Sequence, residues 1–160
     1  MQTTEQKNYT QQESTSRIKN IFKVDETIGV SAFRLWLLRI FYGMAIVFLG
    51  VQVWNKIISH NGIWEPLPAV AYSFWGAFSA LAILGLIHPL KMIPLLLVQF
   101  SYKLIWLIIV AYPLLSANQL AGSSAQGLTK ANGIGIVLDL LIIPWPFVYK
   151  NFVLVSKKNA

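Results

Sequence analysis

The sequence predicts an all-α integral membrane protein, a four-helix bundle with both termini in the cytoplasm. Its 160 residues are 56% hydrophobic and only 12% charged, whereas soluble domains hold about 25% charged residues. The apolar residues gather in four blocks near 33–54, 67–87, 92–115 and 133–153. Each block is close to the ~20 residues that a helix needs to cross the hydrocarbon core of a bilayer. We therefore expect one transmembrane domain over residues 32–153.

The basic residues predict the topology rather than a nucleic-acid partner. The net charge is +7, but the charges flank the apolar blocks and form no stripe with interleaved aromatics, so nucleic acid is excluded. Lysines and arginines cluster before the first block, in the turn after the second and beyond the fourth: Lys7, Arg17, Lys19, Lys23, Arg34, Lys91, Lys150, Lys157 and Lys158. By the positive-inside rule these segments face the cytoplasm of a multi-pass protein of the cell membrane.

Two segments precede the first span, and a short one follows the last. Residues 1–16 are rich in Gln, Thr and Ser, which predicts a disordered cytoplasmic tail. Over 17–31, Ile18, Ile21, Phe22 and Val24 recur among basic residues, a pattern typical either of an amphipathic helix on anionic headgroups or of a plain basic flank. Residues 154–160 form a second cytoplasmic tail. No cleavable signal peptide is expected, because the first 30 residues are polar.

The first span carries one charged face. Arg39, Tyr42, Gly43 and Gly50 fall on one side of a helix, so this side should face the bundle, where the glycines admit a neighbouring helix. Ser31 is a candidate N-cap. Arg39 has two interpretations: it binds helix carbonyls or lipid phosphate, or it belongs to a functional site.

The helix boundaries are predicted from glycine and proline. Gly85 should end the second helix and Pro89 should begin the third, which would make the two antiparallel neighbours. In the second span Ser73 with Ala77 and Gly76 with Ala80 have the spacing of close helix packing. A polar loop is expected near 116–131, and Pro144 and Pro146 should kink the fourth helix.

Lys103 and Asp139 are the charges that the bundle should be built around. A lysine at mid-membrane costs about 2.5–3.5 kcal/mol, so it should face protein and have a partner. Counted from the outer helix ends, Lys103 lies about 15 Å deep and Asp139 about 12 Å, at 1.5 Å per residue. We predict that they form a buried ion pair, and that Gln99 and Tyr102, which share a helix face with Lys103 and Trp106, add hydrogen bonds.

The pair can be architectural, or it can belong to a polar pocket for a lipid headgroup or a quinone, or to a proton relay. The candidate ligand-binding residues are Gln99, Tyr102, Lys103, Trp106, Asp139 and Arg39. Cysteine is absent, and no nucleophile–base set, paired carboxylates, glycine-rich nucleotide loop or clustered metal ligands are visible. We expect no catalytic residue, metal or cofactor, with quinone as the alternative.

The first two spans resemble the DoxX-like group of small four-helix membrane proteins. The resemblance lies in Arg39, Gly43 and Gly50 within RIFYGMAIVFLG and in the segment PLPAVAYSFWGAFSALAILGLIHPLK, about 60 residues. A lysine that the group often has after the second glycine is replaced here by VQVW, and an acid of the second span by Phe78 and Ser79. The resemblance implies a bacterial inner-membrane protein, some relatives of which are membrane subunits of quinone-linked oxidoreductases.

The leading hypothesis is a non-catalytic membrane protein, an accessory or binding subunit that works with the lipid bilayer and with protein partners or further copies of itself. The alternatives are a quinone- or lipid-binding subunit of an oxidoreductase, and a small transporter or proton path through Arg39, Lys103 and Asp139.

Overall fold

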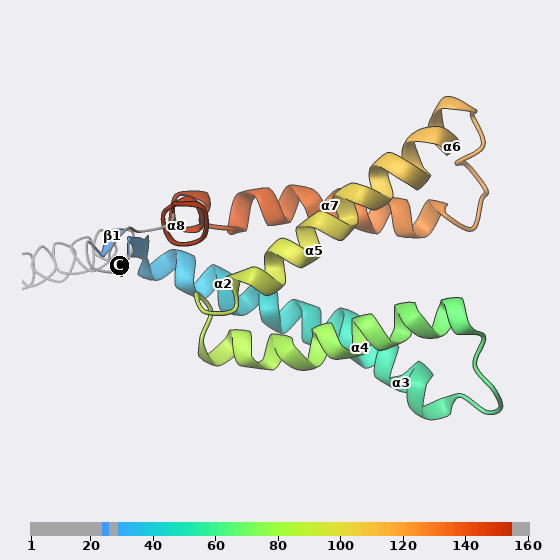
Figure 1. The fold of residues 1–160 in the computed structure, drawn as a ribbon, viewed down its shortest axis with the longest axis horizontal. Coiled ribbons are helices and arrows are strands. Elements are labelled where there is room, and N and C mark those ends of the chain that lie inside the picture. The colour runs from blue at the N-terminus through green and yellow to red at the C-terminus, as the bar shows by residue number, and fades with distance from the viewer. Residues whose placement is uncertain (1–23, 26–28, 155–160) are drawn as a thin grey trace, which may run out of the picture. The chain divides into compact units, whose positions relative to one another are not determined.

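The computed structural model describes residues 24–25 and 29–154 (Figure 1). The chain divides into two compact units, Met1–Leu37 with Pro144–Ala160, and Leu38–Ile143. The predicted tail 1–16 lies outside the described residues, as do 17–23 and 26–28 of the predicted basic segment and 155–160 of the C-terminal tail.

The first unit contains a strand pair that the sequence analysis did not anticipate. β1 (Val24–Asp25) pairs antiparallel with β2 (Val30–Ser31), and Gly29 before β2 has a φ of 72°, which glycine adopts without a steric penalty. Val24 thus lies in a strand and not in a helix. Ser31 is an N-cap, as predicted: its Oγ accepts a hydrogen bond from Arg34 N at 3.3 Å, immediately before helix α2 begins.

The first long rod runs without a break from Ala32 to Ser59. It comprises α2 (Ala32–Met44), the wider π-helical turns of η1 (Ala45–Gly50), and α3 (Val51–Ser59). Helix α4 (Pro66–Ile87) packs against η1 and α3, and Figure 1 shows it beside α3. At this contact a Cβ on Gly50 would lie 3.1 Å from Ser79 Cβ, so Gly50 admits the neighbouring helix as predicted.

The packing face of α4 is only partly the predicted one. Gly76 is buried, but Ser73, Ala77 and Ala80 are exposed, and Ser79 lies on the packing face instead. Its Oγ accepts a hydrogen bond from Trp54 Nε1 at 3.2 Å and donates one to Gly76 O at 2.9 Å.

The prediction that Gly85 ends the second helix and Pro89 starts the third was wrong. Helix α4 continues through Gly85 to Ile87, because the glycine makes room for the Tyr42 ring rather than breaking the helix. The next helix, α5 (Ile93–Trp106), has Pro94 and not Pro89 in its first turn. After this turn α5 packs mainly on α7, and Figure 1 shows it diverging from α4.

The third long helix continues from α5 through η2 (Leu107–Ala111) into α6 (Tyr112–Ser116). Helix α7 (Gln126–Ile142) starts within the stretch 116–131 that was expected to be a loop. It stops at Ile143, whose ψ of 126° is the extended conformation that a following proline favours. The predicted interruption is therefore confirmed at Pro144. Pro146 instead sits in the first turn of α8 (Trp145–Val148), which continues as η3 (Tyr149–Val153).

Within the described residues, three helices are long and apolar enough to cross a membrane: Ala32–Ser59, Pro66–Ile87 and Ile93–Ser116. The number rises to four if Gln126–Ile142 and Trp145–Val153 count as one broken span. This part of the chain is thus all-α apart from the small strand pair.

Candidate functional site

The predicted ion pair is present in the second unit. Lys103 Nζ of α5 lies 3.0 Å from Asp139 Oδ2 of α7, and the two residues are 6% and 0% exposed. The pair joins α5 to α7, and these two helices pack against each other. Both charges lose their hydration on burial, and their mutual attraction offsets part of this cost.

Gly135 makes the approach of Lys103 possible. It lies one helical turn before Asp139, and a Cβ at this position would fall 2.6 Å from Lys103 Nζ and 2.8 Å from Cε. Any side chain here would displace the amine.

The hydrogen bonds expected from Gln99 and Tyr102 to the pair do not form. Among the described residues, Asp139 Oδ1 and Gln99 Oε1 are buried side-chain oxygens without a hydrogen-bond partner. Gln99 is 9% exposed on the face of α5 that also carries Lys103. Because a buried unpaired acceptor costs about 1–3 kcal/mol, these atoms mark a place where the structure is polar but unsatisfied.

Trp106 and Arg39 bind elsewhere. Trp106 Nε1 donates to Thr129 Oγ1 at 3.1 Å, which joins the C-terminal end of α5 to α7. Arg39 Nε donates to Leu86 O at 3.0 Å. Leu86 is in the last turn of α4, where carbonyls lack helical partners and a cation is favourable. This is the carbonyl-binding interpretation of Arg39.

Tyr42 and Gly85 complete the same contact. The buried Tyr42 hydroxyl donates to Pro89 O at 3.2 Å, and a Cβ on Gly85 would overlap the Tyr42 ring. Arg39 and Tyr42 together hold the end of α4 and the turn after it. The two residues share the helix face predicted from their spacing, but the contact is structural.

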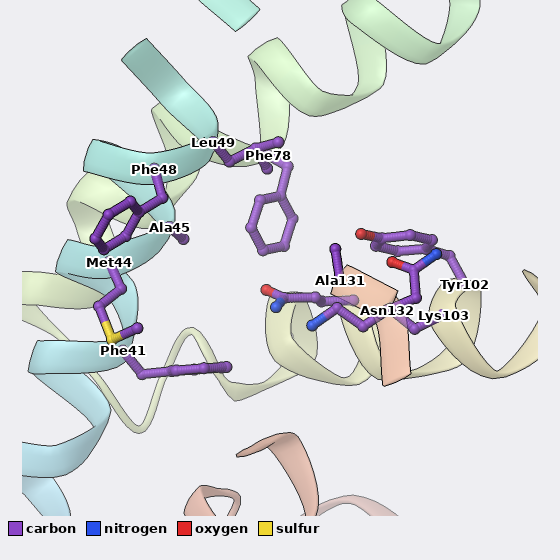
Figure 2. A pocket seen from close by; sticks show the side chains of 11 residues that line it. Phe41, Met44, Ala45, Phe48, Leu49, Phe78, Tyr102, Lys103, Ala131 and Asn132 are labelled. Atoms are coloured by element: carbon purple, nitrogen blue, oxygen red, sulfur yellow. The ribbon is translucent and has the colours of Figure 1, made fainter. Parts of the chain in front are cut away.

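A pocket of ≈ 240 Å³ lies in the second unit between α2 and η1 on one side and α5 and α7 on the other (Figure 2). Its polar side chains are Gln99, Tyr102, Lys103 and Asn132. Its apolar lining comes from Phe41, Met44, Ala45, Phe48, Leu49, Phe78 and Ala131. Figure 2 shows Phe78 entering the space from α4, with Met44 and Phe48 on one side and Tyr102, Lys103 and Asn132 on the other.

The pocket gathers three of the six predicted site residues. Gln99, Tyr102 and Lys103 line it, whereas Trp106, Asp139 and Arg39 do not. Sequence reasoning missed the aromatic and methionine side chains, which had no signal to separate them from other apolar residues. Asn132 could have been found, because its amide lies seven residues, or two helical turns, before Asp139 and so on the same face of the fourth helix.

The described part of the chain has no group of three or more His, Asp or Glu residues that could hold a metal ion. The pocket can therefore donate and accept hydrogen bonds, and the charge of Lys103 beside it is neutralised by Asp139. No protein-family model, curated protein or solved structure matches the chain. The resemblance to the DoxX-like group therefore stays a hypothesis.

Proposed function

We propose that this is a multi-pass membrane protein of the cell membrane, with both termini in the cytoplasm, that works as a non-catalytic binding or accessory subunit. The observation that supports it is an exterior rich in large apolar side chains around a core that also holds polar ones. Among the described residues, the buried polar ones are Ser79, Gln99, Lys103, Asn132 and Asp139, while large apolar side chains such as Ile109, Leu141 and Val70 are more than 60% exposed. Lipid solvates such an exterior, and water does not.

The absence of cysteine makes the topology directly testable. Single cysteines at Asn61 and Gln119, both exposed in loops, should react with a membrane-impermeant maleimide in intact cells. Cysteines at Lys91 and Leu154 should react only after the membrane is opened. Labelling of Leu154→Cys from outside would show that the interrupted fourth helix does not cross, and labelling of Lys91→Cys from outside would reject the whole topology.

The pocket favours the binding role over a proton path. Of the three charges that such a path would use, Arg39 is bonded to a helix end and Asp139 does not line the cavity. A quinone or lipid in the membrane subunit of an oxidoreductase is the more specific form of this proposal. Tagged protein purified in mild detergent should carry a lipid-soluble molecule in stoichiometric amount, and co-purification of a soluble oxidoreductase would support the oxidoreductase form.

The matched comparison for that experiment is Phe78→Trp, which fills the pocket, against Phe152→Trp, an exposed residue of η3. Loss of the molecule in the first variant only is the expected result. Protein that purifies without a bound lipid, quinone or partner from either variant and from wild type would argue against a binding role.

A further inference from the structure

We propose that the pocket takes the uncharged, oxygen-bearing head of a lipid-soluble molecule that enters from the bilayer, and that it discriminates against anionic headgroups. The inference rests on the proposed membrane location and names the class of ligand. Three observations support it: the polar side chains of the pocket, the ion pair that neutralises Lys103, and the exposed apolar side chains at the edge of the pocket.

The pocket holds hydrogen-bonding groups that a ligand could use. Among the described residues, Gln99 Oε1 is buried without a hydrogen-bond partner, and Asn132 and Tyr102 bring an amide and a half-buried hydroxyl to the same pocket. Asn132 is only 6% exposed. Buried amides are almost always paired in proteins. A ligand hydroxyl would donate to Gln99 Oε1, and a ligand hydroxyl or carbonyl oxygen would accept from the Asn132 amide and the Tyr102 hydroxyl.

The charge of the ligand follows from the ion pair. Lys103 is the cation that lines the pocket, and its amine is 3.0 Å from Asp139 Oδ2. An anionic headgroup would have to draw the amine away and leave the carboxylate buried without a counter-charge, which is strongly unfavourable. An uncharged head can accept a hydrogen bond from the amine while the pair stays intact.

The position of the pocket fits a headgroup whose tail remains in lipid. Met44 and Phe48 are 39% and 64% exposed on a candidate span, so the pocket borders the bilayer there. Figure 2 places these two side chains opposite Tyr102, Lys103 and Asn132.

The test uses purified protein in phosphatidylcholine nanodiscs and three probes. Dioctanoylglycerol presents a hydroxyl and ester carbonyls, decylubiquinone presents ring carbonyls, and dioctanoyl phosphatidic acid adds an anionic phosphate to the first probe. At least one uncharged probe should bind saturably, and phosphatidic acid at least about tenfold more weakly. Which uncharged probe binds distinguishes an acylglycerol from a quinone-type ring.

Asn132→Leu removes the amide at similar volume, and Phe78→Trp fills the space. Each should weaken binding about tenfold, as expected for one lost hydrogen bond or a filled site. Asn55→Leu, the same exchange at an exposed position of α3, should not. Tighter binding of phosphatidic acid, no saturable binding of any probe, or equal binding by all variants would overturn the inference. The maleimide labelling would be unaffected by these outcomes, so failure here is separable from failure of the membrane topology.

Discussion

Gly135 of α7 faces the end of the Lys103 side chain so closely that any larger residue would occupy the place of its ammonium group. The ion pair therefore depends on a position that carries no charge. The closeness also fixes how far α5 and α7 can be apart at this level of the helix pair.

Gly135→Ala should destabilise the protein by about 1–3 kcal/mol, the usual cost of overpacking, because Lys103 must move away from Asp139. The measurement is the free energy of unfolding in SDS-containing mixed micelles. Gly133→Ala on the same helix is the control, since a Cβ there meets nothing within 4 Å. It should be neutral or stabilising by up to about 1 kcal/mol, as alanine is the better helix former. Equal effects of the two substitutions would contradict the geometry.

Replacing one member of the Lys103–Asp139 pair should destabilise the protein more than replacing both. Lys103→Met or Asp139→Leu leaves one buried charge without a partner, and we expect about 3–5 kcal/mol of destabilisation for each. The double variant should be clearly more stable than the sum of the two losses implies. A double-mutant cycle measures this difference, and additivity would mean that the two charges do not interact.

Gly85→Ala should disrupt the end of α4, because the new methyl group overlaps the Tyr42 ring. Overpacking here should cost about 1–3 kcal/mol, read as a lower melting temperature in detergent. Gly43→Ala is the matched control, since its nearest neighbour, Leu86 Cδ2, is at an ordinary 3.8 Å. Combining Gly85→Ala with Tyr42→Ala should add little to the loss from Tyr42→Ala alone. If the full cost of Gly85→Ala persists without the ring, the assigned contact is wrong.

The fold and the ion pair could be predicted because both follow from one-dimensional properties of the sequence. Run length and composition predict membrane helices, and depth counted along two helices brings Lys103 level with Asp139. The interruption at Pro144 follows from local backbone sterics. None of these inferences needs to know which faces of two helices meet.

The apolar part of the pocket could not be predicted, for a physical reason. A helix that is apolar all round shows no periodicity to separate a side chain that faces protein from one that faces lipid. Phe78 and Phe48 therefore read alike in the sequence, although one is 3% and the other 64% exposed. Gly85 was misread for a related reason, because its role depends on Tyr42 from a different helix.

Trp106 and Thr129 allow a test of the α5–α7 contact away from the charges. Thr129→Val removes the hydroxyl that accepts the bond from Trp106 Nε1 and keeps the shape of the side chain. A lost hydrogen bond of this kind costs about 0.5–1.5 kcal/mol, and the indole nitrogen becomes unpaired. We expect Thr129→Val to shift the Trp106 indole N–H resonance in NMR spectra and to destabilise by that amount. Adding Trp106→Phe to Thr129→Val should cause no further loss of stability from this hydrogen bond, because the bond is already absent.

Ser101→Ala, which removes a hydroxyl bonded only within α5, controls for the loss of a polar group. An unchanged indole resonance in Thr129→Val would show that these two side chains do not meet.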